Sequence, residues 1–456
     1  MSPNVSNITT DHSKKREEKN CRSVVKNRQL PEKKFELRNS LLTDLFESNQ
    51  HIKTIYHVFI ATLICLFVNT LIHDYAKKGE INIEFRLIYW GFGKLYITII
   101  AWIGFFVDYM FVLRVLWCLG KTSNIRTWDC LWALSLLSYY ILCFRIASLI
   151  VTTFQLPIAS ASIVLLEQVR FLMKIHAFVR SNVRKVLDYK PHSDQPLNLP
   201  DFSKFFYFIF APTLIYRDEY PRTKEIRWNF IVCRILEVTS TIFYYSFLLN
   251  RFLLPFYKDF CMRKFTWSEI IISVFENSTV GILLLLATFF MLLHSVQNIF
   301  AELLRFGDRL FYKDWWTCTS YSEYFRTWNI VVHDWLYTYV YKDMYEIVTP
   351  RCKIAARFAV LILSATVHEW VLTYMFGFFF PALFVQFVFG GSLLSSITPP
   401  KTTILNVLFW YELSVGSGSL VSMYTLEFYA RNNSPMENPS FRDYILPRFF
   451  TCNCIE

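Results

Sequence analysis

The chain has 456 residues, of which 54% are hydrophobic and only 18% are charged. Soluble domains usually carry about 25% charged residues, so this composition excludes a globular domain with a single anchor and indicates a polytopic membrane protein. The formal net charge of +11 does not point to nucleic acid, because Lys and Arg gather in the N-terminal segment and in short loops beside apolar runs, as the positive-inside rule expects.

The apolar stretches are long and continuous, without the period-two alternation of barrel strands. Because lipid cannot satisfy backbone hydrogen bonds, such stretches cross a bilayer as helices. The sequence therefore predicts an all-α, polytopic transmembrane helical bundle of about nine spans, with amphipathic interfacial helices. We expect three regions: a basic, largely disordered cytosolic tail with an interfacial helix near its end (1–50), the multi-span membrane domain (51–430) and a C-terminal segment (431–456).

In chain order, residues 40–47 place apolar residues at helical spacing and predict a short helix at the interface. Residues 158–187 have apolar residues every three or four positions and charged residues on the other side, which predicts a helix at the cytosolic membrane surface, with packing against the bundle left open. A polar loop follows at 190–200. The membrane spans are expected at about 55–72, 87–119, 130–154, 230–254, 270–299 (one long helix or two), 356–380 with a continuation to 389, and 404–424.

Two polar and aromatic segments interrupt the apolar pattern. In 306–316, the preference of Trp for membrane interfaces accounts for Trp315 and Trp316. It does not account for the charged residues beside them, so a cytosolic loop that folds back to a cavity explains the segment better. In 324–336, Asn329 and His333 lie four residues apart and share one helical face, with Arg326 one turn earlier.

His368 is the main candidate for chemistry. It lies inside the apolar stretch 358–377, where ionisable groups are expensive and normally face a bundle interior or a cavity. Ser364 lies one turn earlier on the same face. A zinc motif His-Glu-x-x-His is excluded because position 372 is Leu, and we expect no metal site. A neutral His near an Asn and a Ser suits a general base for an alcohol or water, and a His that only bridges helices is the alternative.

These segments resemble the membrane-bound O-acyltransferases, and within them the sterol O-acyltransferase family. The resemblance rests on Phe-Tyr-Lys-Asp-Trp-Trp at 311–316, Arg-Thr-Trp-Asn-Ile-Val-Val-His-Asp-Trp at 326–335 and Ser-Ala-Thr-Val-His-Glu at 364–369. Further similar stretches are 38–47, 52–57, 210–222 and 438–444, so the resemblance covers roughly 38–452.

The resemblance implies a multi-pass enzyme of the endoplasmic reticulum membrane that moves a fatty acyl group from acyl-CoA to a sterol 3-hydroxyl. It needs no cofactor, since acyl-CoA is a substrate, and it is a homodimer or a higher homo-oligomer. His368 and Asn329 match the catalytic positions, and His57 matches a sterol-contacting position. The positions that match acyl-CoA contacts are Arg326, Asn329, His333, Tyr341, Lys353 and Ser364. The aromatic motif consists of Phe311, Tyr312, Asp314, Trp315 and Trp316.

Two positions depart from the family pattern. Thr317 follows the aromatic motif where the family usually has Asn, and Glu323 replaces an Asn that helps to bind CoA in relatives. A carboxylate near phosphates is expected to oppose donor binding.

Other functions fit parts of the sequence. The same fold acting on diacylglycerol or a long-chain alcohol is the near alternative. A non-catalytic sterol- or lipid-binding membrane protein would be favoured by loss of His368 or Asn329, and both are present. A transporter should show paired broken helices or charged residues in several spans, whereas this chain has one dominant polar centre.

Overall fold

The computed structural model describes residues 31–79, 85–119, 126–187, 200–395, 400–435, 443, 445–452 and 455. Most of the predicted tail, nearly all of the loop at 190–200 and most of 438–444 lie outside the described residues. In the described part the regular structure is helical, and only isolated bridges pair extended backbone.

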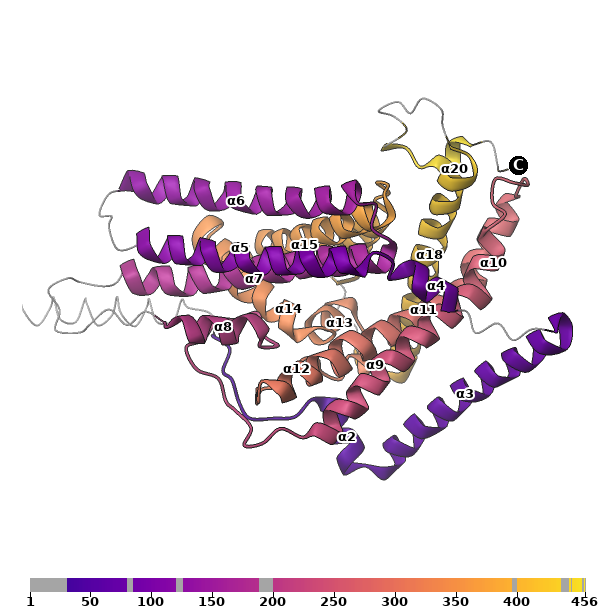
Figure 1. Ribbon diagram of the computed structural model, residues 1–456, viewed down its shortest axis with the longest axis horizontal. Coiled ribbons are helices and arrows are strands. Elements are labelled where there is room, and N and C mark those ends of the chain that lie inside the picture. The colour runs from indigo at the N-terminus through magenta and orange to yellow at the C-terminus, as the bar shows by residue number, and fades with distance from the viewer. Residues whose placement is uncertain are drawn as a thin grey trace, which may run out of the picture.

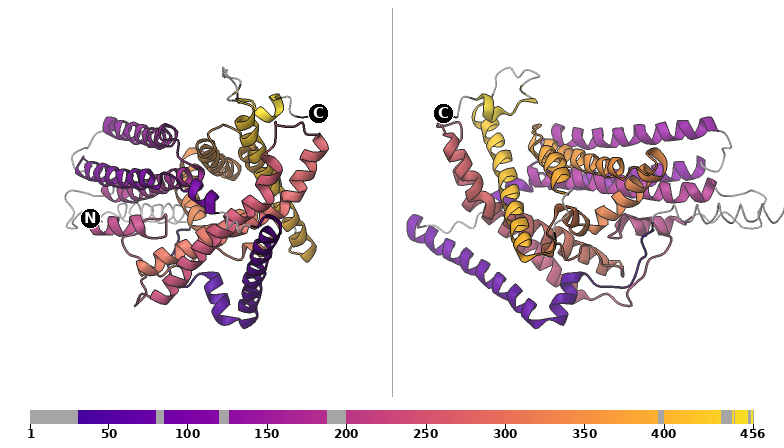
Figure 2. Two further views of the ribbon diagram at one scale, coloured as in Figure 1. Left: turned by 45° about the vertical axis from the view of Figure 1, so that its right-hand side comes forward. Right: turned by 180° about the vertical axis from the view of Figure 1, so that it is seen from behind.

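Seven helices in the described part are long and apolar enough to cross a membrane. Figures 1 and 2 show one group of nearly parallel helices and others that cross this group at steep angles. The stretch expected to hold one helix or two is one continuous helix. The spanning segments are α3 (Gln50–Lys78), α4 and α5 (Phe85–Gly91, Leu95–Leu119), α6 (Arg126–Thr153), α9 with η1 and α10 (Trp228–Leu248, Leu249–Leu253, Leu254–Tyr257), α11 with η2 and α12 (Trp267–Thr288, Phe289–Val296, Gln297–Leu303), α15 (Lys353–Phe376) and α18 (Thr403–Asn433).

Helix α7 (Ile158–Leu187) packs against the bundle, as the sequence allows, and its place at a membrane surface stays a prediction. It runs alongside α5 and packs against α5, α6 and α15 (Figures 1 and 2). The face of α7 that carries the charged residues is partly buried. Lys174 on this face is buried and donates hydrogen bonds to the carbonyl oxygens of Phe208 and Ala211. These two carbonyl groups lie at the end of a neighbouring helix, α8 (Phe202–Phe210).

A shorter apolar helix at Ala382–Leu393 returns between α15 and α18. It consists of α16 (Ala382–Val385), the π-helical turn η6 (Gln386–Gly390) and α17 (Gly391–Ser395). The described part therefore holds seven candidate spans, so the predicted count of about nine is only approximate.

Helix starts follow local capping chemistry. The short helix predicted at residues 40–47 is confirmed as α2 (Leu41–Ser48), and its place at a membrane interface stays a prediction. The Asn49 side chain then caps α3 by accepting from the N–H groups of His51 and Ile52. Thr266 and Glu269 form a capping box at the start of α11. These side chains satisfy N–H groups that have no partner within their helix.

Helices α11 and α18 meet along a glycine seam. A Cβ atom built on Gly281 would lie 2.5 Å from the backbone nitrogen of Gly418, and one built on Gly418 would lie 2.5 Å from Cα of Ser278. Any larger residue would push the two backbones apart, so the absent side chains permit this close packing.

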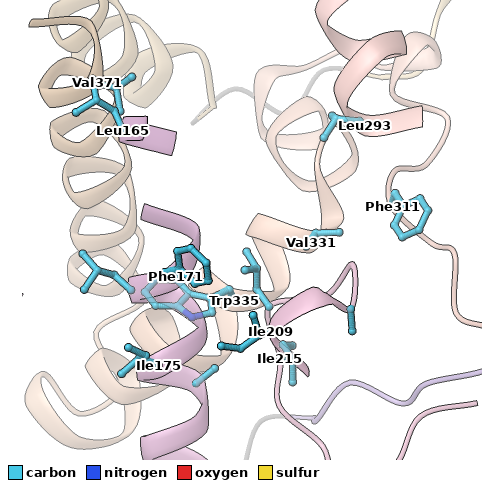
Figure 3. Close-up of a cluster of buried hydrophobic side chains, with 14 of the residues drawn as sticks. Leu165, Phe171, Ile175, Ile209, Ile215, Leu293, Phe311, Val331, Trp335 and Val371 are labelled. Atoms are coloured by element: carbon cyan, nitrogen blue, oxygen red, sulfur yellow. The ribbon is translucent and has the colours of Figure 1, made fainter. Parts of the chain in front are cut away.

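The largest core cluster lies where α7, α8 and α15 meet the polar and aromatic segments. Figure 3 shows Val371 of α15 beside Leu165 of α7, and Trp335 of α14 (Ile330–Trp335) beside Phe171 of α7. The segments that the sequence marks as unusual are therefore part of the core. The short helices in and after these segments are η3 (Trp315–Thr317), α13 (Tyr321–Thr327), α14, η4 (Leu336–Tyr341) and η5 (Met344–Val348). One more short helix, α20 (Arg448–Thr451), lies near the C-terminus.

Candidate active site

Helix α15 carries His368 and ends at Gly377, whose φ of 80° suits glycine. The Nδ1 atom of His368 lies 2.7 Å from the carbonyl oxygen of Ser364, one turn earlier. Because a carbonyl can only accept, Nδ1 carries the proton and Nε2 carries the lone pair. The imidazole is exposed in the protein alone, so Nε2 can receive a proton from a bound molecule.

The neighbouring Glu369 is buried and is 5% exposed. Its carboxylate accepts hydrogen bonds from the N–H group of Phe384 and from the hydroxyl of Tyr424. The two adjacent ionisable residues therefore have separate surroundings. His368 faces open space, and Glu369 joins α15 to the return helix and to α18.

Asn329 is the N-cap of α14, and its Oδ1 accepts the N–H group of Val332 at 3.1 Å. This contact fixes the orientation of the amide and directs its Nδ2 group away from the capped turn. Arg326 is exposed at the end of α13 and donates from Nε to the carbonyl oxygen of Ser322. Lys353 is exposed at the first residue of α15.

His333 and Tyr341 belong to a column of stacked rings that continues through every fourth residue. The centroids of His333 and Tyr337 are 6.3 Å apart, those of Tyr337 and Tyr341 are 5.6 Å apart, and those of Tyr341 and Tyr345 are 6.0 Å apart. The planes of each pair lie within 13°. The column spans π-helical turns η4 and η5, a geometry often found at functional sites.

Asp334 links this region to the N-terminal segment. Its Oδ2 lies 2.6 Å from Nζ of Lys33, and both side chains are mostly buried. Burial would raise the pKa of Asp334, but its contacts with His333 and Lys33 outweigh that effect and lower the pKa. The carboxylate is therefore charged at neutral pH.

The aromatic motif is built into the core. Trp315 is 1% exposed, and its ring packs against the rings of Phe289, Trp328 and Trp410. Phe311 and Tyr312 are also buried, so a preference for the interface is not what places these residues. Asp314 is exposed, and Trp316 is half-buried with its carbonyl oxygen accepting from α18.

The charged residues near the motif hold it in place. Arg38 pairs with Asp308 at 2.7 Å, and Arg309 pairs with buried Glu302 at 2.6 Å. Gly307, which directly precedes Asp308, has no room for a side chain, because a Cβ would lie 2.9 Å from the carbonyl oxygen of Pro221. The segment therefore folds back onto the bundle, as the sequence predicts. It does so through close packing and ion pairs, and the expected cavity stays a prediction.

Sequence reasoning missed His294, which is fully buried in η2. Its Nε2 contacts Arg234, so its Nδ1 donates to the hydroxyl of Tyr312 at 2.7 Å. The sequence contains a signal for His294, because it is a lone His in an apolar run, the same feature that singles out His368.

The two residues that depart from the family pattern each interact with a neighbouring residue. Thr317 donates to the carbonyl oxygen of Asp314 at 2.7 Å, and Glu323 forms an ion pair with Lys401. His57 lies on α3, and its ring contacts that of Tyr56. A role for His57 in binding a sterol stays a prediction.

The sequence matches a known protein family and several named relatives. The model of the membrane-bound O-acyltransferase family matches residues 85–426. The chain is 42% identical over 434 residues to sterol O-acyltransferase 1 of Cricetulus griseus, which covers 92% of this chain and 78% of that protein. It is 41% identical to the same protein of Mus musculus, covering 92% and 79%, and 37% identical to sterol O-acyltransferase 2 of Homo sapiens, covering 92% and 81%.

Proposed function

The chain belongs to the membrane-bound O-acyltransferase family, and from that premise we propose that it transfers a fatty acyl group from acyl-CoA to the 3-hydroxyl of a sterol, giving a sterol ester and CoA. The protein is a multi-pass membrane acyltransferase. The assignment of individual residues to the reaction is our proposal.

The observation that carries the mechanism is the hydrogen bond from Nδ1 of His368 to the carbonyl oxygen of Ser364. It leaves Nε2 as the basic nitrogen and directs it away from the helix backbone. The Nε2 atom removes the proton of the sterol hydroxyl while its oxygen attacks the thioester carbonyl carbon. The tetrahedral intermediate then expels CoA, whose sulfur receives the proton from His368.

Asn329 stabilises the oxyanion of that intermediate. Its Oδ1 is occupied by the N–H group of Val332, so its Nδ2 group is the donor. A donor held in place before the reaction costs no reorganisation as charge develops on the carbonyl oxygen.

The donor CoA binds at the cytosolic side, where the basic N-terminal segment remains. Arg326 and Lys353 are exposed cations that suit its phosphates. In this proposal the rings of His333 and Tyr341 also contact the CoA, and Ser364 contacts the thioester end of the donor. The acceptor enters from the membrane, where His57 contacts the sterol.

The resemblance to sterol enzymes also supports a location in the endoplasmic reticulum membrane and assembly as a homodimer or a higher homo-oligomer. Immunofluorescence with an organelle marker and light scattering of the detergent-solubilised protein test these two statements. A plasma-membrane pattern contradicts the first, and a monomer mass contradicts the second.

A microsomal assay with labelled oleoyl-CoA tests the activity, with cholesterol, diacylglycerol and a long-chain alcohol as competing acceptors. We expect sterol ester as the main product. Triacylglycerol or wax ester as the main product would overturn the choice of acceptor. Absence of any ester from folded protein would favour a lipid-binding role.

The variants His368→Ala and Asn329→Ala test the site. We expect each to abolish esterification or to lower it by at least about 100-fold, without loss of membrane expression. His51→Ala is the matched control, because His51 is an exposed His at the start of α3 and lies outside the proposed site. Retained turnover in His368→Ala contradicts the mechanism.

A further inference from the structure

The return helix between α15 and α18 is anchored by two buried polar side chains. The first turn of α16 has N–H groups that lack partners within the helix. The N–H group of Leu383 donates to the hydroxyl oxygen of Tyr424 at 3.3 Å, and that of Phe384 donates to Oε2 of Glu369 at 3.2 Å. The Tyr424 hydroxyl in turn contacts the carbonyl oxygen of Phe380 at 2.9 Å.

This anchoring fixes the register of the helix that follows. One side chain from α15 and one from α18 hold the same turn, so the helix can neither slide nor rotate without breaking buried hydrogen bonds. Breaking such bonds is costly because the groups would be left without partners. The next turn, η6, is consequently held at a defined position relative to His368, which is adjacent in sequence to Glu369.

Phe387 of η6 lies against the face of the His368 imidazole. The ring centroids are 5.7 Å apart, and the planes differ by 25°. The Phe387 ring also contacts the ring of Phe325 of α13, with centroids 5.0 Å apart. Phe387 is half-buried, and it stands between the proposed base and the helix that carries Arg326.

The imidazole of His368 needs this second contact. Its hydrogen bond to the carbonyl oxygen of Ser364 restrains Nδ1, but one hydrogen bond at one edge leaves the ring free to tilt about that contact. An aromatic ring packed against the face restricts the tilt. Together the two contacts determine the direction of Nε2.

We propose that Phe387 is a positioning residue for His368, which holds the plane of the imidazole so that Nε2 remains directed at the acceptor hydroxyl. This inference rests on the proposed function, because it assumes that His368 is the base. Phe387 takes no part in proton transfer. It acts through the orientation of His368, and Glu369 and Tyr424 act through the anchoring of its helix.

Misplacing a catalytic group by about 1 Å can cost about 100-fold in rate. The Phe387 contact orients a group that acts in the transition state, so its loss should lower kcat with KM little changed. A residue that only contacted substrate would raise KM, and one that only supported the fold would lower the amount of folded enzyme.

The experiment compares Phe387→Leu and Phe387→Tyr with Phe389→Leu in the purified full chain. Phe389 lies in the same π-helical turn but is 67% exposed, so its variant is a matched control. We expect Phe387→Leu to lower kcat by about 10- to 100-fold, with KM for oleoyl-CoA and for cholesterol within about twofold. Phe387→Tyr keeps a flat ring and should retain most of kcat, and Phe389→Leu should match the native enzyme.

Three results would overturn the inference: a kcat for Phe387→Leu equal to that of Phe389→Leu, a loss carried by KM alone, or a Phe387→Tyr variant as slow as Phe387→Leu. If Phe387→Leu does not fold, Phe387→Met replaces it, because Met has similar bulk without a ring. A native enzyme without ester synthesis, or an active His368→Ala, overturns the proposed function instead.

Discussion

The Nζ atom of Lys401 lies 2.6 Å from Oε1 of Glu323. Glu323 occupies a position where the resemblance implies an Asn that contacts CoA, so its charge was expected to repel the donor. Lys401 comes from the loop before α18 and supplies a compensating cation from a distant part of the sequence. The pair offers a way for a carboxylate to lie near the proposed CoA site.

The first prediction concerns this pair. Lys401→Ala should raise KM for oleoyl-CoA by about twofold to fivefold, because the Glu323 charge is then uncompensated. Glu323→Gln should remove that penalty, and the double variant should resemble Glu323→Gln alone. Michaelis kinetics at low and high salt measure the effect. An equal KM for Lys401→Ala and the native enzyme at low salt would show that the pair does not influence the donor.

The second prediction concerns the pH dependence of the Lys33–Asp334 contact, whose carboxyl has a pKa below its ordinary value of 3.8. A carboxyl with a lowered pKa in the folded state stabilises the fold above its unfolded pKa and loses that contribution as pH falls through the folded pKa. Asp334→Asn should therefore cost about 1 kcal/mol at pH 7. The difference from the native protein should begin to shrink below about pH 4 and disappear once the pH is below the lowered folded pKa.

Thermal unfolding of the detergent-solubilised protein across pH measures this difference. Asp201→Asn is the control for removal of a carboxylate from an exposed position. A difference between Asp334→Asn and the native protein that stays constant from pH 7 to pH 3 would count against the contact.

The third prediction concerns the buried carboxylate of Glu302, whose side chain is fully buried and pairs with both Arg227 and Arg309. Removing it leaves two cations unpaired at a packed site. Glu302→Ala should therefore destabilise the protein by about 3–5 kcal/mol, seen as loss of folded protein on thermal unfolding. Glu276→Ala on the same continuous helix removes an exposed carboxylate and should not destabilise it. Equal unfolding temperatures for the two variants would contradict this account.

The fourth prediction concerns Tyr424. Tyr424→Phe removes the hydroxyl that contacts Leu383, Phe380 and Glu369, and leaves buried polar groups without that partner. We expect a loss of about 1–3 kcal/mol in the free energy of unfolding, together with a lower kcat. Tyr429→Phe, also on α18, should change neither, because the Tyr429 ring packs on Phe428. A stable and fully active Tyr424→Phe would refute the anchoring of the return helix.

The sequence predicted the helices where hydropathy is decisive. The spans around Ile55, Phe230 and Ile404 are confirmed as helices, and so is the helix that carries His368. The sequence did not predict the surroundings of Lys174 on α7, because tertiary packing brings to it the carbonyl oxygens that accept its hydrogen bonds. Helical periodicity shows on which face of a helix the charged residues lie, but it does not show which carbonyl groups will contact them in the folded protein.

The candidate site was predicted only in part. The four-residue spacing correctly places the backbone carbonyl of Ser364 beside His368. In contrast, Phe387 lies nineteen positions after His368, beyond a glycine turn and a separate short helix, and no local spacing relates the two rings. Lys401 reaches Glu323 in the same way, across a distance in sequence that only the fold removes.

The glycine seam between α11 and α18 has a consequence for catalysis. Gly418 and Tyr424 are six residues apart on one helix, about 9 Å along its axis. A methyl group added at Gly418 would displace α18 and carry the Tyr424 hydroxyl with it, and through the return helix the displacement would reach the ring that faces His368. Substitution at a helix contact remote from both substrates should therefore change the rate of acyl transfer, so residues that never touch substrate also constrain the chemistry.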